Sequence, residues 1–167
     1  MSYSIIGGAD GPTSIFLAGK IGTGWFNIYG LVFLILLLIP NVVYAIKFRN
    51  IENKCKVKWA NILEQIGRYA SMFFMVFTFG SLAGGWASVE ALFCYFFGSI
   101  ILLVLYWLVW LLYFIEQKKW KSMTLAIVPT LLFLLGGMTM QNILAIIFAM
   151  LFGIGHIFVT YQNSHNE

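Results

Sequence analysis

The chain offers few side chains that could do chemistry, and the densest group of them stands near the N-terminus, in the segment GGADGPTS. Asp10 is the only aspartate of the chain and forms a turn pair with Gly11, and Thr13 adds a hydroxyl. Gly7 and Gly8 allow a positive φ or a close backbone approach. A broken backbone with exposed carbonyls, one carboxylate and hydroxyls supplies the hard oxygen ligands that suit an alkali cation, as at the interrupted helices of transporters. The same residues also fit a turn in which Asp10 caps a short helix that begins at Pro12. From the sequence, both interpretations stay open.

Two further polar residues interrupt long apolar stretches. Asn41 follows Pro40, which frees a backbone carbonyl in a helix, and the Asn41 amide could bond that carbonyl or a neighbouring helix. His156 stands in the segment GIGH, and an ionisable residue at membrane depth indicates a functional site such as a proton or ion relay. Its place late in the last apolar stretch, near the cytoplasmic interface, weakens that hypothesis. Asn41 and His156 are therefore the intramembrane polar candidates.

The elements that must position these residues are apolar helices. Hydrophobic residues make up 61% of the 167 residues and charged residues 10%, against about 25% charged in an ordinary soluble domain. Stretches free of Asp, Glu, Lys and Arg cover 21–46, 69–89, 91–115 and 122–166, and a crossing needs about 20 residues. The last stretch is broken by a turn at LGGMTMQN. The sequence therefore predicts an all-α, polytopic integral membrane protein with about five transmembrane helices, at 27–46, 69–87, 91–115, 123–137 and 141–161. The fourth is short and carries Pro129, so we expect a kink or an incomplete crossing.

The positive charges predict the orientation of the chain. Nine of the ten Lys and Arg residues fall in two loops, 47–68 and 116–122, and Lys20 precedes the first helix. Because basic loops are retained on the cytoplasmic side, we expect the N-terminus outside and the C-terminus in the cytoplasm. The chain then divides into a Gly-rich N-terminal segment, 1–26, re-entrant or external, and a five-helix transmembrane domain, 27–167, with basic cytoplasmic loops. The net charge of +4 follows from this asymmetry and requires no nucleic-acid partner.

Local patterns predict two further details of the helical domain. Apolar residues from Trp59 to Tyr69 follow helical spacing, which indicates an interfacial helix that runs into the second span. On it, Glu64 and Arg68 stand four residues apart and are well placed for an ion pair. Ser88 is expected to cap the third helix.

The opening motif resembles a known family. Residues 6–15, IGGADGPTSI, are similar to the conserved Asp-Gly-Pro-Thr segment of the β subunit of sodium-translocating decarboxylases. The resemblance covers about 20 positions of the chain, and it implies that Asp10 is a sodium-binding carboxylate whose site is shaped by Gly8, Gly11 and Thr13. From the first span onward, the chain looks like small uncharacterised bacterial polytopic membrane proteins, a resemblance carried by residues 39–47 and 64–68.

Two functions follow from these observations. The first is a decarboxylase β-subunit-like membrane protein that forms a component of sodium transport, with Na⁺ on Asp10 and no other cofactor. The alternative is a non-catalytic membrane protein with a structural or partner-binding role. We do not expect an enzyme, because the helices lack paired carboxylates, a zinc motif and a Ser/His/Asp set. Expected partners are the lipid bilayer and other membrane proteins or a second copy, and the expected location is a bacterial cell membrane, which the chain crosses several times.

Overall fold

Five helices account for most of the residues that the structure describes. The computed structural model describes residues 25–48, 55, 57–78 and 85–165. These form α1 (Ile28–Lys47), α2 (Lys58–Val76), α3 (Val89–Ile115), α4 (Lys119–Thr139) and α5 (Ile143–His165). Phe26 and Phe77 form an isolated antiparallel β-bridge. The expected all-helical fold class is therefore confirmed for the described residues.

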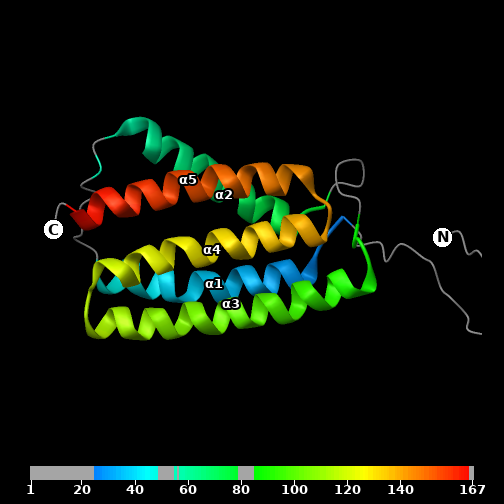
Figure 1. Cartoon of the computed structure of the whole chain (residues 1–167), viewed down its shortest axis with the longest axis horizontal. Coiled ribbons are helices and arrows are strands. Elements are labelled where there is room, and N and C mark those ends of the chain that lie inside the picture. The colour runs from blue at the N-terminus through cyan, green and yellow to red at the C-terminus, as the bar shows by residue number, and fades with distance from the viewer. Residues whose placement is uncertain (1–24, 49–54, 56, 79–84, 166–167) are drawn as a thin grey trace, which may run out of the picture.

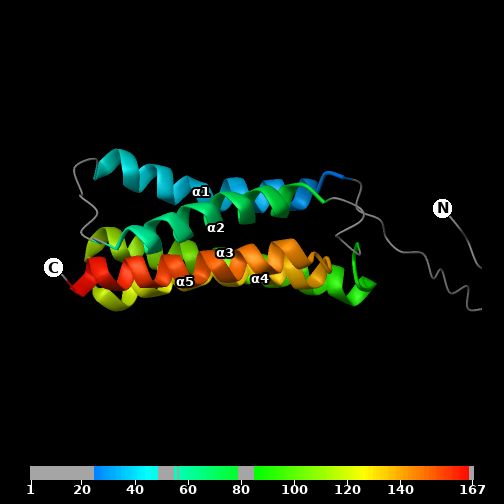
Figure 2. The ribbon, with the colours of Figure 1, turned by 90° about the horizontal axis from the view of Figure 1, so that it is seen from above.

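Successive helices run in opposite directions along one axis (Figures 1 and 2). One end of the bundle, called the basic end below, holds Lys47, Lys58 and the lysine-rich turn between α3 and α4. The opposite end holds the start of α1, the end of α2 and the turn between α4 and α5. The described chain starts at this opposite end, and α5 finishes at the basic end. An odd number of antiparallel helices produces this separation.

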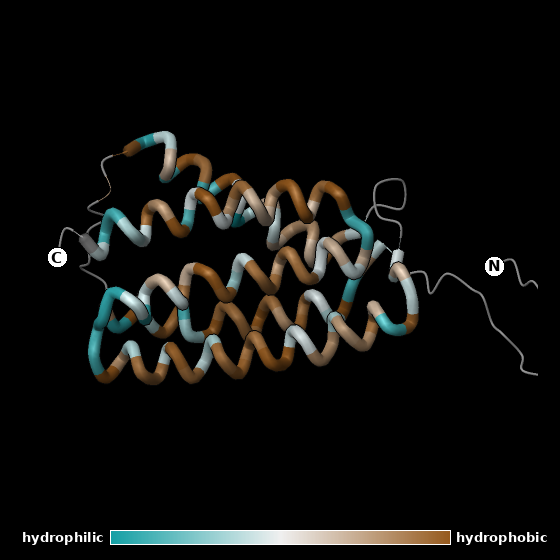
Figure 3. The backbone as a smooth tube through the Cα atoms, in the orientation of Figure 1, coloured by the Kyte–Doolittle hydropathy of each residue, from teal (hydrophilic) through white to brown (hydrophobic). Residues whose placement is uncertain are grey.

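The outer faces of the bundle are apolar. Long side chains along α1 and α3 stand exposed, including Val32, Ile101 and Leu111. Figure 3 shows hydrophobic residues along the middle of the helices and hydrophilic residues gathered toward their ends. Soluble monomers rarely expose contiguous apolar surface of this extent. Four helices, α1, α3, α4 and α5, are long and apolar enough to cross a membrane, so the architecture is compatible with a multi-pass membrane protein.

The second helix differs from its prediction. A span was expected at 69–87 and a basic loop at 47–68, but α2 begins at Lys58 and ends at Val76. The predicted interfacial helix and the first part of the predicted span are thus one continuous helix. After Val76 the backbone is extended, because it pairs with the segment before α1: the Asn27 amide donates to the Val76 carbonyl (2.7 Å), and the Thr78 amide donates to the Trp25 carbonyl (3.0 Å).

The fourth helix is longer than predicted. It starts at Lys119 rather than at residue 123, it continues through Pro129 to Thr139, and its 21 residues are enough for a full crossing. The second basic loop, expected at 116–122, is correspondingly short. The cause is Lys121, whose buried ammonium donates to the carbonyls of Leu112 (2.8 Å) and Glu116 (2.9 Å) at the end of α3. A lysine in this position stabilises the C-terminus of the preceding helix, so the lysine-rich segment packs as the first turn of α4.

The short connections at the opposite end follow local chemistry. The predicted cap of α3 is confirmed, since the Ser88 hydroxyl accepts a hydrogen bond from the Ala91 amide (3.0 Å). The predicted turn between the last two helices is confined to Met140–Asn142, where Gln141 has a positive φ of 50°. The Asn142 side chain then accepts from the Ala145 amide (3.1 Å) and caps α5.

Candidate functional site

Three ionisable side chains meet between α2 and α5. The Glu64 carboxylate accepts a hydrogen bond from Arg68 Nη2 in an ion pair one helical turn apart, as predicted. The same oxygen, Oε1, lies 2.9 Å from Nδ1 of His156. Glu64 is buried, with a side-chain exposure of 10%, against 22% for His156. Since an ionised carboxylate only accepts hydrogen bonds, the hydrogen of this contact belongs to Nδ1.

Glycines bring the two helices close enough for this contact. A Cβ at Gly67 of α2 would lie 2.4 Å from the backbone nitrogen of Phe152 in α5. Reciprocally, a Cβ at Gly155 of α5 would lie 2.6 Å from the backbone nitrogen of Glu64. Small residues at helix contacts let backbones approach in this way within membranes. The approach at Gly155 sets the neighbouring His156 beside Glu64.

An aromatic ring supports the basic side chains. Phe152 stacks on the His156 imidazole, with ring centroids 4.8 Å apart and planes inclined by 16°. The guanidinium carbon of Arg68 lies 6.0 Å from the centroid of the same Phe152 ring, within the range of a cation–π contact. The Phe152 ring therefore contacts both basic groups that bond Glu64.

The network borders a pocket of about 340 Å³. All five described helices contribute to its wall: Leu37, Leu38 and Asn41 from α1; Arg68, Tyr69 and Met72 from α2; Tyr106 from α3; Pro129 and Phe133 from α4; Phe152 and His156 from α5. The helices α1 and α2 are joined at the opposite end and diverge toward the basic end (Figures 1 and 2). A mostly apolar pocket with a few convergent polar groups is the usual form of a small-molecule site.

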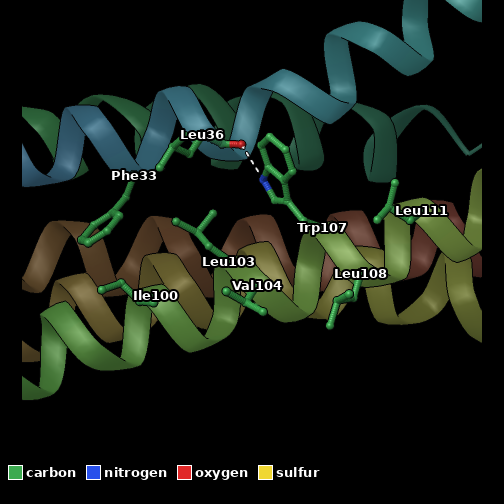
Figure 4. Close-up of a pocket in the computed structure, with 8 residues that line it drawn as sticks. All are labelled: Phe33, Leu36, Ile100, Leu103, Val104, Trp107, Leu108 and Leu111. Carbon is green, nitrogen blue, oxygen red and sulfur yellow. Dashed lines mark hydrogen bonds between the residues drawn. The ribbon is translucent and has the colours of Figure 1, made fainter.

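The candidate residue Asn41 lies in this pocket. Its amide nitrogen donates to the carbonyl of Leu37 (2.9 Å) and to the Tyr106 hydroxyl on α3 (2.8 Å). Asn41 therefore bonds a neighbouring helix, one of its two expected roles. Pro40 leaves the Leu36 carbonyl without its helical donor. That carbonyl instead accepts from the Trp107 indole of α3 at 3.1 Å, as Figure 4 shows.

A second pocket of similar volume, about 340 Å³, lies between α1 and α3 around this bond. Figure 4 shows its lining, which is apolar throughout: Phe33, Leu36, Ile100, Leu103, Val104, Trp107, Leu108 and Leu111. It offers no titratable group and no free charge. The polar pocket is therefore the candidate site.

The network lies well inside the bundle. Glu64 stands six residues after the start of α2 and Arg68 ten, which at 1.5 Å per residue is roughly 9 Å and 15 Å from the basic end. His156 lies nine residues before the end of α5, or roughly 14 Å from that end. Arg68 was expected on an interfacial helix within the basic segment 47–68, and it lies in the interior of α2.

The remaining candidates fall elsewhere. Asp10, Gly8, Gly11 and Thr13 lie outside the described residues, so the sodium site expected there stays a prediction. Among the residues that are described, no group of three or more His, Cys, Asp or Glu side chains could hold a metal ion.

Sequence reasoning did not pair Glu64 with His156, because it placed Glu64 on an interfacial helix outside the spans and considered the histidine only as an isolated polar residue. The two residues are 92 positions apart, and the local sequence around each does not indicate the other as its partner. One signal was present: Gly67 and Gly155 each stand within three residues of a member of the pair. Small residues beside a polar group indicate a close helix contact.

Comparison with known proteins gives no family for this arrangement. No protein-family model matches the chain, and neither a curated protein nor a solved structure matches it.

Proposed function

We propose that this protein is a multi-pass membrane transport component that binds a small solute inside its helix bundle. The observation that carries this proposal is the network of Glu64, Arg68 and His156 beside a pocket lined by every described helix. Charged side chains at membrane depth are costly, and where they occur they typically mark substrate or ion pathways. A purely structural bundle gains little from a buried ion pair, because hydrophobic residues of similar volume are often as stabilising.

All five helices, including the more polar α2, cross the bilayer in this proposal. The helix α1 ends at the basic end and α3 begins at the opposite end, so α2 must traverse the bundle to connect them. Its 19 residues span roughly 28 Å, close to the hydrocarbon thickness of about 30 Å. The basic end is cytoplasmic, the described chain begins outside, and the membrane is a bacterial cell membrane.

Cysteine labelling tests this topology. In a chain with Cys55 and Cys94 replaced by alanine, one variant carries Ala87→Cys and another Lys119→Cys. A membrane-impermeant maleimide added to intact cells should label the first and should reach the second only after permeabilisation. Labelling of both positions from the same side would show that α3 does not cross, and the reverse pattern would contradict the proposed topology.

Solvent access to the pocket tests the function. Met72 lines the pocket, whereas Ile39 is 40% exposed on the outer face of α1. A solute site must admit water, so Met72→Cys should react with a small charged thiosulfonate in membranes, and Ile39→Cys, facing lipid, should not. If Met72→Cys is as unreactive as Ile39→Cys, the pocket is closed. The structural or partner-binding role would then be the better account.

Sodium transport is a second candidate, supported by the residues of the N-terminal segment rather than by the pocket. Asp10 with Gly8, Gly11 and Thr13 resembles the ion-binding segment of the decarboxylase β subunit. Added NaCl, compared with KCl, should then raise the unfolding temperature of the protein, and Asp10→Asn should abolish the difference. An unfolding temperature that does not distinguish Na⁺ from K⁺ in the parent protein would refute this candidate.

A further inference from the structure

Arg68 and Tyr106 line the pocket and can donate hydrogen bonds to a ligand, whereas both amide hydrogens of Asn41 are already donated within the protein. Arg68 has five N–H donors, and among the described residues only Glu64 accepts from it. The Tyr106 hydroxyl accepts from the Asn41 amide and keeps its own hydrogen to donate. The lining contains no carboxylate, because Glu64 stands behind Arg68 and His156. The pocket therefore suits a ligand that accepts hydrogen bonds, which is the property of an anion.

The charges around the pocket limit what that anion can be. Arg68 and Glu64 cancel each other, so a bound anion would leave one unbalanced negative charge inside the bundle, which is costly in a low dielectric. One proton taken from solvent water onto His156 removes this imbalance. The imidazolium retains its Nδ1 contact with Glu64 and gains a hydrogen on Nε2. The other titratable groups in the lining are Tyr69 and Tyr106, and α1 and α4 contribute none.

Size and shape complete the description of the ligand. The pocket volume of 340 Å³ corresponds to about eleven water molecules, and most of its wall is apolar. With His156 protonated, the network carries one net positive charge, which matches a monoanion rather than a phosphate dianion. The planar guanidinium of Arg68 fits the two oxygens of a carboxylate. We propose that the pocket binds a monocarboxylic acid with a compact apolar body, and that one proton is taken up on His156; this rests on the proposed solute-binding function.

Such an acid has two sources, water and the bilayer. Hexanoate represents a free acid, and laurate represents an acid dissolved in the lipid. The full chain in nanodiscs of zwitterionic phospholipid is titrated with hexanoate by calorimetry, with hexanol and hexylammonium as probes of the same apolar body. Laurate labelled with ¹³C at its carboxyl is placed in the nanodisc and followed by NMR. Binding in either arm supports the proposal and identifies the source.

Charge selectivity and proton uptake are the expected results. Hexanoate should bind at least tenfold more tightly than hexanol or hexylammonium, and at least fivefold more tightly at pH 6 than at pH 8, the range in which histidine ordinarily changes charge. With laurate in the nanodisc, the carboxyl carbon should show a second chemical shift, that of the bound acid. An excess of lauryl alcohol should not remove this signal. Calorimetry in two buffers of different ionisation enthalpy should detect a proton bound with the acid. His156→Gln, whose amide can still donate to Glu64, should remove that uptake.

Paired variants keep the test independent of folding. Glu64→Gln combined with Arg68→Gln removes both charges together, and acid binding should weaken at least tenfold while SDS-induced unfolding stays cooperative. Tyr106→Phe removes one donor and should weaken binding several-fold. Ile39→Ala, on the outer face, is the matched control and should leave the affinity unchanged.

Three results would overturn the inference: equal affinity for hexanol and hexanoate, unchanged affinity in the doubly neutralised variant, or no binding in either arm. If no acid binds while Met72→Cys still reacts from water, the pocket serves a solute of another chemistry and the proposed function stands. If Met72→Cys is also unreactive, both proposals fail together.

Discussion

Replacing Gly67 by alanine should separate α2 from α5. The added Cβ would lie 2.4 Å from the backbone nitrogen of Phe152, whereas ordinary contact begins at 3.4 Å, so the helices must part locally by the difference of 1.0 Å. The obstructing atoms belong to backbone and cannot rotate away. The Glu64–His156 contact, now 2.9 Å, would lengthen toward about 3.9 Å, beyond hydrogen-bond distance.

The expected cost follows from three contributions. Overpacking a well-packed contact costs about 1–3 kcal/mol, and loss of a hydrogen bond to a charged group costs about 1.5–3 kcal/mol. Alanine recovers about 1 kcal/mol through its better helix propensity. Added together, these contributions give an expected decrease of about 1.5–5 kcal/mol in the free energy of unfolding for Gly67→Ala.

Unfolding by SDS in mixed micelles, followed by far-ultraviolet circular dichroism, measures this change. Gly136→Ala is the matched control, because its Cβ would meet only Tyr95 Cε2, at an ordinary 3.4 Å. That variant should be neutral or up to about 1 kcal/mol more stable than the parent protein. If Gly67→Ala matched Gly136→Ala in stability, the close α2–α5 contact, and with it the geometry of the network, would be refuted.

Two further predictions use the same unfolding assay. Trp107→Phe removes the indole donor to the Leu36 carbonyl and should lower the free energy of unfolding by about 1 kcal/mol. In a Pro40→Ala background the restored backbone amide can donate to that carbonyl, so a double-mutant cycle should show that Trp107→Phe costs much less there. Additive effects of the two substitutions would contradict the role assigned to Trp107. Lys121→Met keeps the apolar stem but removes the ammonium; the Glu116 carbonyl then loses this donor, while the Leu112 carbonyl keeps the Glu116 amide. We expect a destabilisation of about 1–3 kcal/mol, whereas the exposed Lys119→Met should change little. Equal effects of the two substitutions would show that the buried ammonium contributes no cap.

Much of the fold is predictable because lipid-compatible helices are encoded locally. Uninterrupted apolar stretches predict α1, α3 and α5 within a few residues, and the Ser88 cap and the turn before α5 follow from nearby residues. The start of the second helix was misplaced because the charged residues before Tyr69 were assigned to the membrane interface. Glu64 is in fact buried inside the bundle, a placement that hydropathy along the chain does not reveal.

The candidate site was less predictable than the fold. Asn41 and His156 were recognisable as polar residues in apolar stretches, and the Glu64–Arg68 pair as neighbours on one helical turn. The link between the pair and the histidine depends on two glycines meeting the opposite backbone, a condition that joins residues far apart in the chain.

The sequence by itself therefore determined the helical class, the membrane-compatible composition and the clustering of positive charge, because each depends on residue type and local spacing. Only the tertiary structure decided that Glu64, Arg68 and His156 share one network, that all the described helices line one pocket, and that Trp107 serves the carbonyl freed by Pro40. Those contacts depend on the crossing distance and register of helices. Both are set by packing at a few small residues, and the periodicity of any single helix carries no information about them.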